Sequence, residues 1–150
     1  MKSRARRWAL KAGAALAAGA GLAVLSPAPY AQAGTSCTLA GCSETYNYSG
    51  LLALAVRDWT CSSGTTGSAS TGCVSLSHTR WLSDGTRTPS GQDWDAFQVD
   101  AGWCYLVELH TPGKKWYVDY DRRGKSTPVY VKVEDWGVAY LRGQSTTTCP

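Results

Sequence analysis

Apolar and polar side chains alternate along three segments in the second half of the chain. Residues 103–109 place Trp, Tyr, Val and Leu on one face, and residues 116–121 and 129–134 repeat the alternation. Because successive side chains of a strand point to opposite faces of a sheet, this period predicts half-buried antiparallel strands. Turn-forming residues separate the segments, and residues 138–142 supply one more strand. We therefore expect the second half to form a four-stranded meander.

The first half of the chain is expected to add strands to the same domain. Three of its segments are apolar or alternating, and polar stretches rich in Gly, Ser and Thr, typical of surface loops, separate them at 62–72 and 83–92. The three segments are 51–59, 73–82 and 93–99. The chain is thus predicted to be all-β, with a single small antiparallel sandwich or barrel of six or seven strands.

All six cysteines lie after residue 33: Cys37, Cys42, Cys61, Cys73, Cys104 and Cys149. An even number of cysteines in a small exported chain predicts three disulfides. A zinc site is not expected, because there is no Cys-x-x-Cys pair and the two histidines, His78 and His110, stand apart. Six cysteines allow many pairings. The most local choice is Cys37–Cys42, Cys61–Cys73 and Cys104–Cys149, and the connectivity stays open.

Residues 1–33 have the three parts of a cleaved secretion signal. A basic head precedes an apolar run at 12–25, and Ala31-Gln32-Ala33 follows as a cleavage site. The apolar run is shorter than the roughly twenty residues that span a bilayer, which disfavours a membrane anchor. We therefore expect a secreted, extracellular protein without membrane insertion. Arg6-Arg7 resembles the twin-arginine export motif, so that route and the general secretory route both stay open.

Removal of the signal changes the charge of the chain. The full chain carries +4, with 15 Lys and Arg against 11 Asp and Glu. Five of the basic residues and none of the acidic ones lie in the signal, so residues 34–150 carry 15 − 5 = 10 basic and 11 acidic residues, a net charge of −1. This balance does not favour nucleic acid or an anionic membrane as the partner. No cofactor is expected.

Two groups of residues invite a metal-binding or catalytic interpretation. Asp93 and Asp95 would share a strand face, as calcium ligands or glycosidase carboxylates do, but carboxylates also cap turns before strands. Glu108 and His110 share a face, with Arg122-Arg123 one hairpin away, and these are the residue types of base, acid and phosphate clamp in a small ribonuclease. Since no nucleophile–base pair or metal cluster is visible, we expect a protein that is not an enzyme.

Aromatic residues are frequent for so small a domain. Six Trp and seven Tyr remain after residue 33. Trp and Tyr are enriched at recognition surfaces, although they also replace aliphatic bulk in disulfide-rich cores. Tyr117 and Tyr130 fall on the polar faces of their strands, so we expect them to be exposed and to bind a partner.

Residues 34–49 are expected to form an extended arm in front of a β-domain at 50–150. Leu39 is the one bulky aliphatic residue of this segment, and a strand-like run follows at 45–48. Such an arm either forms an edge strand of its own sheet or adds to, or inserts into, another protein. In the second case its contact residues would be Cys37, Thr38, Leu39, Cys42, Thr45, Tyr46 and Tyr48.

Several stretches of the chain resemble small secreted proteins of filamentous actinobacteria. They are Asp58-Trp59-Thr60-Cys61 with its Ser/Gly/Thr loop to Cys73, Pro89-Ser90-Gly91-Gln92-Asp93-Trp94-Asp95, and Val99-Asp100-Ala101-Gly102-Trp103-Cys104. The chain is similar to the small adaptor subunits of umbrella toxin particles. This resemblance implies an adaptor that joins a lectin to a large repeat-bearing toxin through an N-terminal extension. Residues 37–48 would then be the anchor, and the β-domain would hold the lectin.

The expected function is therefore that of a secreted, non-enzymatic protein-binding adaptor in an antibacterial toxin complex that serves competition between bacteria. Its partners would be secreted proteins. One alternative is an inhibitor of a secreted enzyme such as a protease, which would insert the loop 62–72 into an active site. The other alternative is a carbohydrate-binding module, which would use an aromatic face and need no arm.

Overall fold

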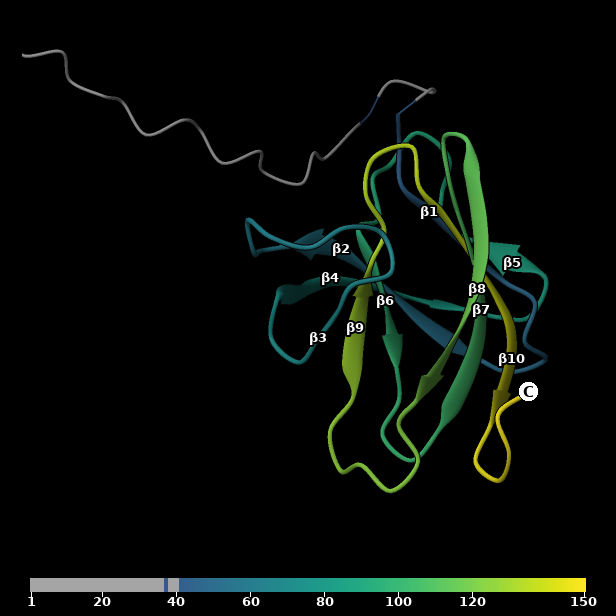
Figure 1. Cartoon of the computed structure of the whole chain (residues 1–150). Helices are drawn as coiled ribbons and strands as arrows, with labels where there is room; N and C mark the ends of the chain where they lie inside the picture. The colour runs from purple at the N-terminus through teal and green to yellow at the C-terminus, as the bar shows by residue number, and fades with distance from the viewer. Residues whose placement is uncertain (1–36, 38–40) are drawn as a thin grey trace, which may run out of the picture.

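Two five-stranded sheets face one another in a sandwich (Figure 1). The computed structural model describes Cys37 and residues 41–150, and this part of the chain contains ten strands and no helix. The all-β, mostly antiparallel sandwich predicted from the sequence is confirmed. The described residues contain more strands than the expected six or seven because three short ones are added: β3 and β5 at the edges of the sheets, and β1 between β5 and β10. The predicted secretion signal at 1–33 lies outside the described residues.

The first sheet has the order β5–β1–β10–β7–β8. Its strands are β1 (Glu44–Asn47), β5 (Thr86–Arg87), β7 (Cys104–Thr111), β8 (Lys114–Asp121) and β10 (Val138–Ser145). β1 runs parallel to β10, and the other pairs are antiparallel. The register places Tyr46, Tyr140, Glu108 and Tyr117 in one row across β1, β10, β7 and β8.

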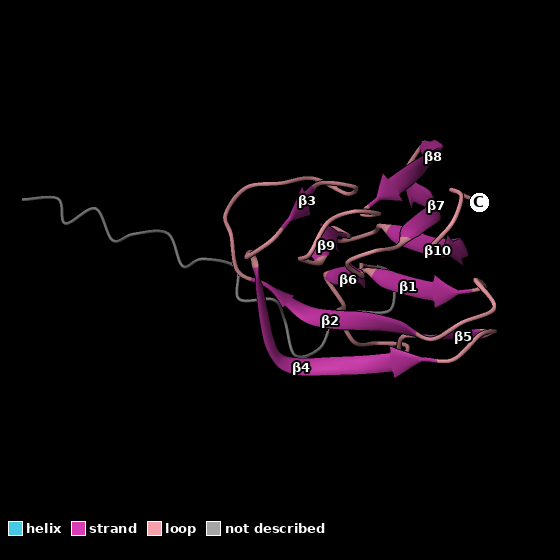
Figure 2. Cartoon of the chain, turned by 90° about the horizontal axis from the view of Figure 1, so that it is seen from below, coloured by secondary structure: helices cyan, strands magenta, loops and turns pink. Residues whose placement is uncertain are grey.

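The second sheet has the order β3–β9–β6–β2–β4. Its strands are β2 (Ala53–Trp59), β3 (Ala69–Ser70), β4 (Val74–Leu82), β6 (Ala96–Val99) and β9 (Val129–Lys132). Figure 2 shows β2 and β4 as a long antiparallel pair on the opposite side of the molecule from β7 and β8. The pair carries an irregularity between Val56 and Asp58, near which β4 bends.

The predicted meander of the second half is wrong in one element. β7, β8 and β10 are neighbours, but β9 pairs with β6 and β3 in the opposite sheet. The connection 122–128 carries the chain from one sheet to the other (Figure 1). Alternation along a strand shows which side chains share a face, but it is the same in either sheet, so it does not reveal this crossing.

The core lies between the sheets, and three disulfides reinforce it. Its largest fully buried side chains include Phe97, Tyr105, Leu109, Val131 and Leu141. The disulfides join Cys37 to Cys42, Cys61 to Cys73 and Cys104 to Cys149, which confirms the most local of the pairings considered. Three disulfides indicate an oxidising, extracellular environment. Within the described residues, no helix is long and apolar enough to cross a membrane.

Candidate functional site

Glu108 stands at the centre of the outer face of the first sheet. Tyr105, Val107 and Leu109 of β7 point into the core, so the alternation of the strand turns Glu108 and His110 outward. Neighbouring side chains cover the carboxylate, and Glu108 is only 2% exposed. A carboxylate buried to this degree needs compensating partners, because an unpaired buried charge is strongly destabilising.

Four side chains from three strands donate to this carboxylate. His110 Nε2 and Lys115 Nζ each lie 2.6 Å from Oε1, and the Tyr117 hydroxyl donates to Oε2 over 2.9 Å. Arg142 completes the group with its Nε and Nη2, both 2.9 Å from Oε2. The hydrogen bond from Lys115, with the smaller contributions of the other donors, lowers the pKa of Glu108 to about 2 although burial opposes the shift. Glu108 is therefore ionised at neutral pH.

A stack of tyrosines lies beside Glu108 on the same face. The ring centroids of Tyr46 and Tyr140 are 4.9 Å apart, and Tyr48 stacks 6.4 Å from Tyr140. The Arg142 guanidinium lies 4.9 Å from the Tyr140 centroid and 5.6 Å from that of Tyr48. On the other side of the stack, Arg87 lies 5.3 Å from the Tyr46 centroid.

We call this surface the Glu108 face. It comprises the outward side chains of the first sheet around Glu108, namely Glu44, Tyr46, Tyr48, Arg87, Glu108, His110, Lys115, Tyr117, Tyr140 and Arg142. Its charged and aromatic members hold one another through hydrogen bonds and ring contacts. The side chains are thus ordered before any partner binds, which reduces the entropy cost of binding.

The geometry of the Glu108 face suits recognition of a protein better than stacking of a sugar. A sugar-stacking platform needs an open ring face, but the tyrosine faces are covered by one another and by Arg87 and Arg142. Tyr and Arg are the residue types most enriched at the centres of protein interfaces.

The ribonuclease arrangement considered from the sequence is not assembled. Glu108 and His110 do meet, but their direct 2.6 Å contact leaves no room between them for a phosphate. Arg123 binds Asp121, which pairs with Cys104 across the β7–β8 ladder. Cys104 is six residues from His110 along β7, so at roughly 3.4 Å per residue Arg123 is held about 20 Å from His110. A carboxylate with a pKa near 2 is also a weak general base.

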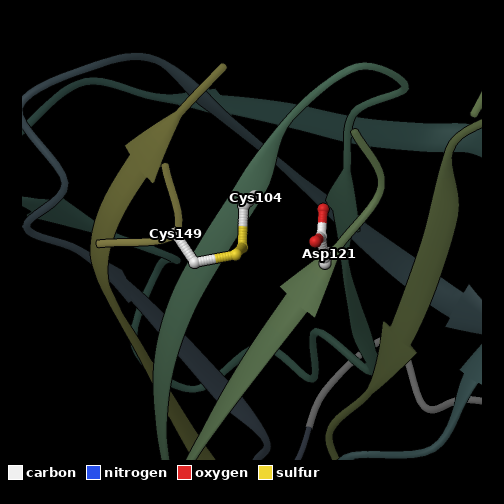
Figure 3. A group of neighbouring side chains, drawn as sticks. All are labelled: Cys104, Asp121 and Cys149. Atoms are coloured by element: carbon white, nitrogen blue, oxygen red, sulfur yellow. A yellow bond between two sulfur atoms is a disulfide. The ribbon is translucent and has the colours of Figure 1, made fainter. Parts of the chain in front are cut away.

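Cys104, Asp121 and Cys149 form a cluster at the far end of the first sheet (Figure 3). Figure 3 shows the two sulfur atoms joined to each other, with Asp121 on the neighbouring strand β8. Sulfurs in a disulfide are not thiolate ligands, and Asp121 accepts hydrogen bonds from Arg123. This cluster fastens the end of the chain to β7.

Asp93 and Asp95 bind the segment that enters β1. Asp93 Oδ1 accepts from the backbone N–H of Ser43 over 2.8 Å and from its hydroxyl, and the N–H of Trp59 donates to Asp95 Oδ2 over 3.1 Å. Burial raises the pKa of Asp95 to about 7. The hydrogen bond from the Trp59 N–H lowers this pKa, and the negative charge of Asp93 raises it further. Asp135 adds a third carboxylate within 4.8 Å. The donors to Asp93 and Asp95 are Ser43 and Trp59, which lie 36 to 52 residues away in the chain, so these carboxylates join distant segments to the start of β6, whereas the alternative considered from the sequence was a local turn cap.

The predicted arm enters the domain at these carboxylates. Residues 34–36 and 38–40, with Thr38 and Leu39, lie outside the described residues. Residues 44–47 form β1, and β10 and β5 take both sides of this strand. This part of the arm therefore takes the alternative of a strand in its own sheet, and its backbone is not available to a partner. Thr45 is buried, whereas Tyr46 and Tyr48 belong to the Glu108 face.

An exposed tryptophan stands next to the small disulfide loop at this entry. The backbone N–H of Trp136 donates to the carbonyl of Gly41, and the Trp136 indole lies beside Gly41. Gly41 is adjacent to Cys42 of the disulfide. Trp136 is 58% exposed and has a φ of 66°, in the left-handed region that a bulky residue seldom adopts. A large indole held in the open in this way is a candidate contact residue.

The two surface tyrosines predicted from strand periodicity behave differently. Tyr117 is 56% exposed and belongs to the Glu108 face. The expected exposure of Tyr130 is wrong, because this side chain is 7% exposed and packs with Val56, Trp59 and the Cys61–Cys73 disulfide. Trp59 and the disulfide cover this side of the second sheet, and Val129, Tyr130 and Val131 of β9 are all buried.

Five residues of the Glu108 face are not identified by the sequence: Glu44, Arg87, Lys115, Tyr140 and Arg142. Each stands at an outward position of a strand, but only the strand order brings them beside Glu108. The parallel pairing of β1 with β10 joins segments almost a hundred residues apart in the chain, and no local pattern signals it.

Comparison of the chain with models of protein families, with curated proteins and with solved structures found no match.

Proposed function

We propose that this protein is a secreted, non-enzymatic adaptor that binds two other secreted proteins. The Glu108 face carries the proposal, since it combines exposed and half-buried tyrosines with two arginines held by carboxylates, Arg142 by Glu108 and Arg87 by Glu44. This composition and this order are typical of the energetically dominant part of a protein interface.

The entry to β1 supplies the second contact. Ser43 is fixed by Asp93, and Trp136 is fixed against Gly41, so the Cys37–Cys42 loop starts from a rigid point on the domain. An exposed indole beside this entry is a residue type typical of the centres of protein interfaces. Following the resemblance in the sequence, one partner would be a large repeat-bearing toxin, and a lectin would bind the domain.

Secretion of the protein is part of the proposal. The basic, apolar and small-residue regions of 1–33 support it, as do three disulfides in a domain of this size. An antibacterial role in competition between bacteria follows from the same resemblance.

The structure offers less support to the two alternatives. A loop that inhibits an enzyme must project from the body, but the middle of 62–72 is tied down: Gly67 N–H donates to the Lys132 carbonyl, and Tyr120 donates to that of Gly67. Thr66 and Glu134 bond to each other twice. A carbohydrate module needs open aromatic faces, and those of the tyrosine stack are covered.

Recovery of partners from the culture fluid of the producing cells tests the proposal. The protein is expressed there with a tag after Pro150, captured from the fluid under oxidising conditions, and its companions are identified by mass spectrometry. We expect a large secreted repeat protein and a lectin. Capture of the protein alone would contradict the adaptor function.

A pair of tryptophan variants tests the contact at the entry to β1. Trp136→Gly removes the indole, and glycine adopts the local φ of 66° without strain. Trp81→Ala is the matched control, because Trp81 is 59% exposed but lies on β4 of the other sheet. We expect Trp136→Gly to reduce recovery of one partner at least tenfold, and Trp81→Ala to leave it unchanged. Equal recovery with both variants would exclude Trp136 as a contact.

A further inference from the structure

Positive charge predominates where the Glu108 face meets solvent. Its three cationic side chains, Lys115, Arg87 and Arg142, are between 37% and 54% exposed, whereas Glu108 and Glu44 are 3% and 21% exposed. At the centre, two permanent cations bind a single carboxylate. This part of the face therefore keeps a net positive charge in a protein whose residues 34–150 sum to −1.

Glu108 acts as a counter-ion that places the cations without using all their donors. Arg142 presents Nε and Nη2 to Glu108, and Lys115 presents its Nζ. A guanidinium carries five N–H groups and an ammonium three, so both cations keep donors for a second acceptor. The rest of the Arg142 guanidinium is held against Tyr140 and Tyr48, which fixes its direction.

We infer that the Glu108 face docks an acidic segment of a partner protein, one with consecutive Asp or Glu side chains. The inference rests on the proposed function, because it names the chemistry of one of the two partners. Carboxylates of the segment would bind Lys115 and Arg142, and its neighbouring side chains would pack against the exposed edges of Tyr48 and Tyr117. Charge-assisted hydrogen bonds of this kind are stronger than neutral ones.

The margins of the face favour a short acidic segment over a long polyanion. Glu44 lies at one side, on β1, and the exposed Asp119 lies on β8 at the next outward position after Tyr117. These carboxylates would repel a nucleic acid that ran across the sheet, whereas a short segment fits between them.

Binding of fluorescein-labelled hexaglutamate to the purified, disulfide-bonded chain tests the inference. Fluorescence anisotropy measures the affinity at low and physiological ionic strength, and amide chemical shifts locate the peptide. We expect binding that weakens with salt, with shifts confined to the neighbourhood of residues 46–48, 108–117 and 140–142. Absence of binding at low ionic strength, or shifts centred elsewhere, would overturn the inference.

A matched pair of charge variants separates this site from general attraction. Lys115→Gln removes one cation of the face while Arg142 still binds Glu108, so the fold is kept. Lys125→Gln removes an exposed lysine of the 122–128 connection. We expect the first variant to weaken hexaglutamate about fivefold, the effect of losing one ion pair, and the second to change it less than about twofold. Equal weakening by both would overturn the inference.

The two proposals fail in different ways. If the tagged protein recovers two partners from the culture fluid but hexaglutamate does not bind, the adaptor function stands and the acidic docking segment is rejected. If hexaglutamate binds at the Glu108 face but no partner is recovered, the adaptor function is rejected and the anion site remains.

Discussion

Asp95 should make the protein less stable at mildly alkaline than at mildly acidic pH. Burial raises the pKa of Asp95 in the folded protein to about 7, from 3.8 for an unperturbed aspartate. Between these two values the folded state keeps a proton that the unfolded state has lost. The free energy of unfolding therefore falls as the pH rises, by at most about 1.4 kcal/mol per pH unit.

The size of this effect follows from the two pKa values. Integration from pH 5 to pH 8 gives a loss of roughly 3 kcal/mol from Asp95 alone. Burial and the charge of Asp93 also raise the pKa of Asp135, which adds to the fall. The opposite contribution of Glu108 belongs to another range. The pKa of Glu108 is lowered to about 2 from the 4.5 of an unperturbed glutamate. The stability that Glu108 provides is therefore lost only when the pH falls below 4.5 and towards 2.

Urea unfolding of the native protein and of Asp95→Asn at several pH values between 5 and 8 measures this. The asparagine carbonyl keeps an acceptor for the Trp59 N–H but carries no charge. We expect the variant to lose most of the pH dependence and to be at least as stable as the native protein at pH 8. Asp119→Asn, at an exposed site, should keep the native slope. A native stability that is flat or rises with pH, or an unchanged slope in Asp95→Asn, would refute the argument.

Three further predictions concern the stability of the fold. Glu108→Gln should lower the free energy of unfolding at pH 7 by about 3 kcal/mol in urea titrations, because its partly exposed cationic partners lose a buried counter-ion; a change below about 1 kcal/mol would contradict this. By the same measurement, Tyr130→Ala should lower the free energy of unfolding by about 3–5 kcal/mol and Tyr117→Ala by about 1 kcal/mol, because Tyr130 is buried and Tyr117 is exposed. Similar losses of stability in the two variants would contradict this difference in burial. Replacing Cys61 and Cys73 together by serine should cost about 2–4 kcal/mol and lower the melting temperature, and an unchanged melting temperature would show that the loop needs no staple.

Much of the fold could be predicted from local sequence. Seven of the ten strands in the described residues, β2, β4 and β6–β10, follow from alternating or apolar segments and from the turn residues between them, because the pleat of a strand has a period of two. The Cys61–Cys73 pair flanks a single polar loop, which made it the natural choice. Short strands such as β3 and β5, of two residues each, leave too little pattern to be recognised.

Arrangement in space was harder to predict, for a physical reason. Contacts between segments far apart in the chain determine which sheet receives β9. Such contacts also determine that β1 lies parallel to β10. The same limit applies to the site. Glu108, His110 and Tyr117 are close in sequence, so strand periodicity is enough to single them out. Tyr140 and Arg142, by contrast, reach Glu108 only through the pairing of β10 with β7. Burial of Tyr130 depends on Trp59 and the Cys61–Cys73 disulfide, which pack against it from other segments and which periodicity does not describe.

The central claim is that one molecule of this protein connects two others, and sequential capture tests it most directly. The complex is first captured through the tag on this chain, then released and captured again through one of the partners found. The account predicts that the second eluate contains the other partner as well, and that Trp136→Gly removes one partner from it. If the second eluate holds only this protein and the partner used for capture, the complexes are binary and the adaptor function is contradicted.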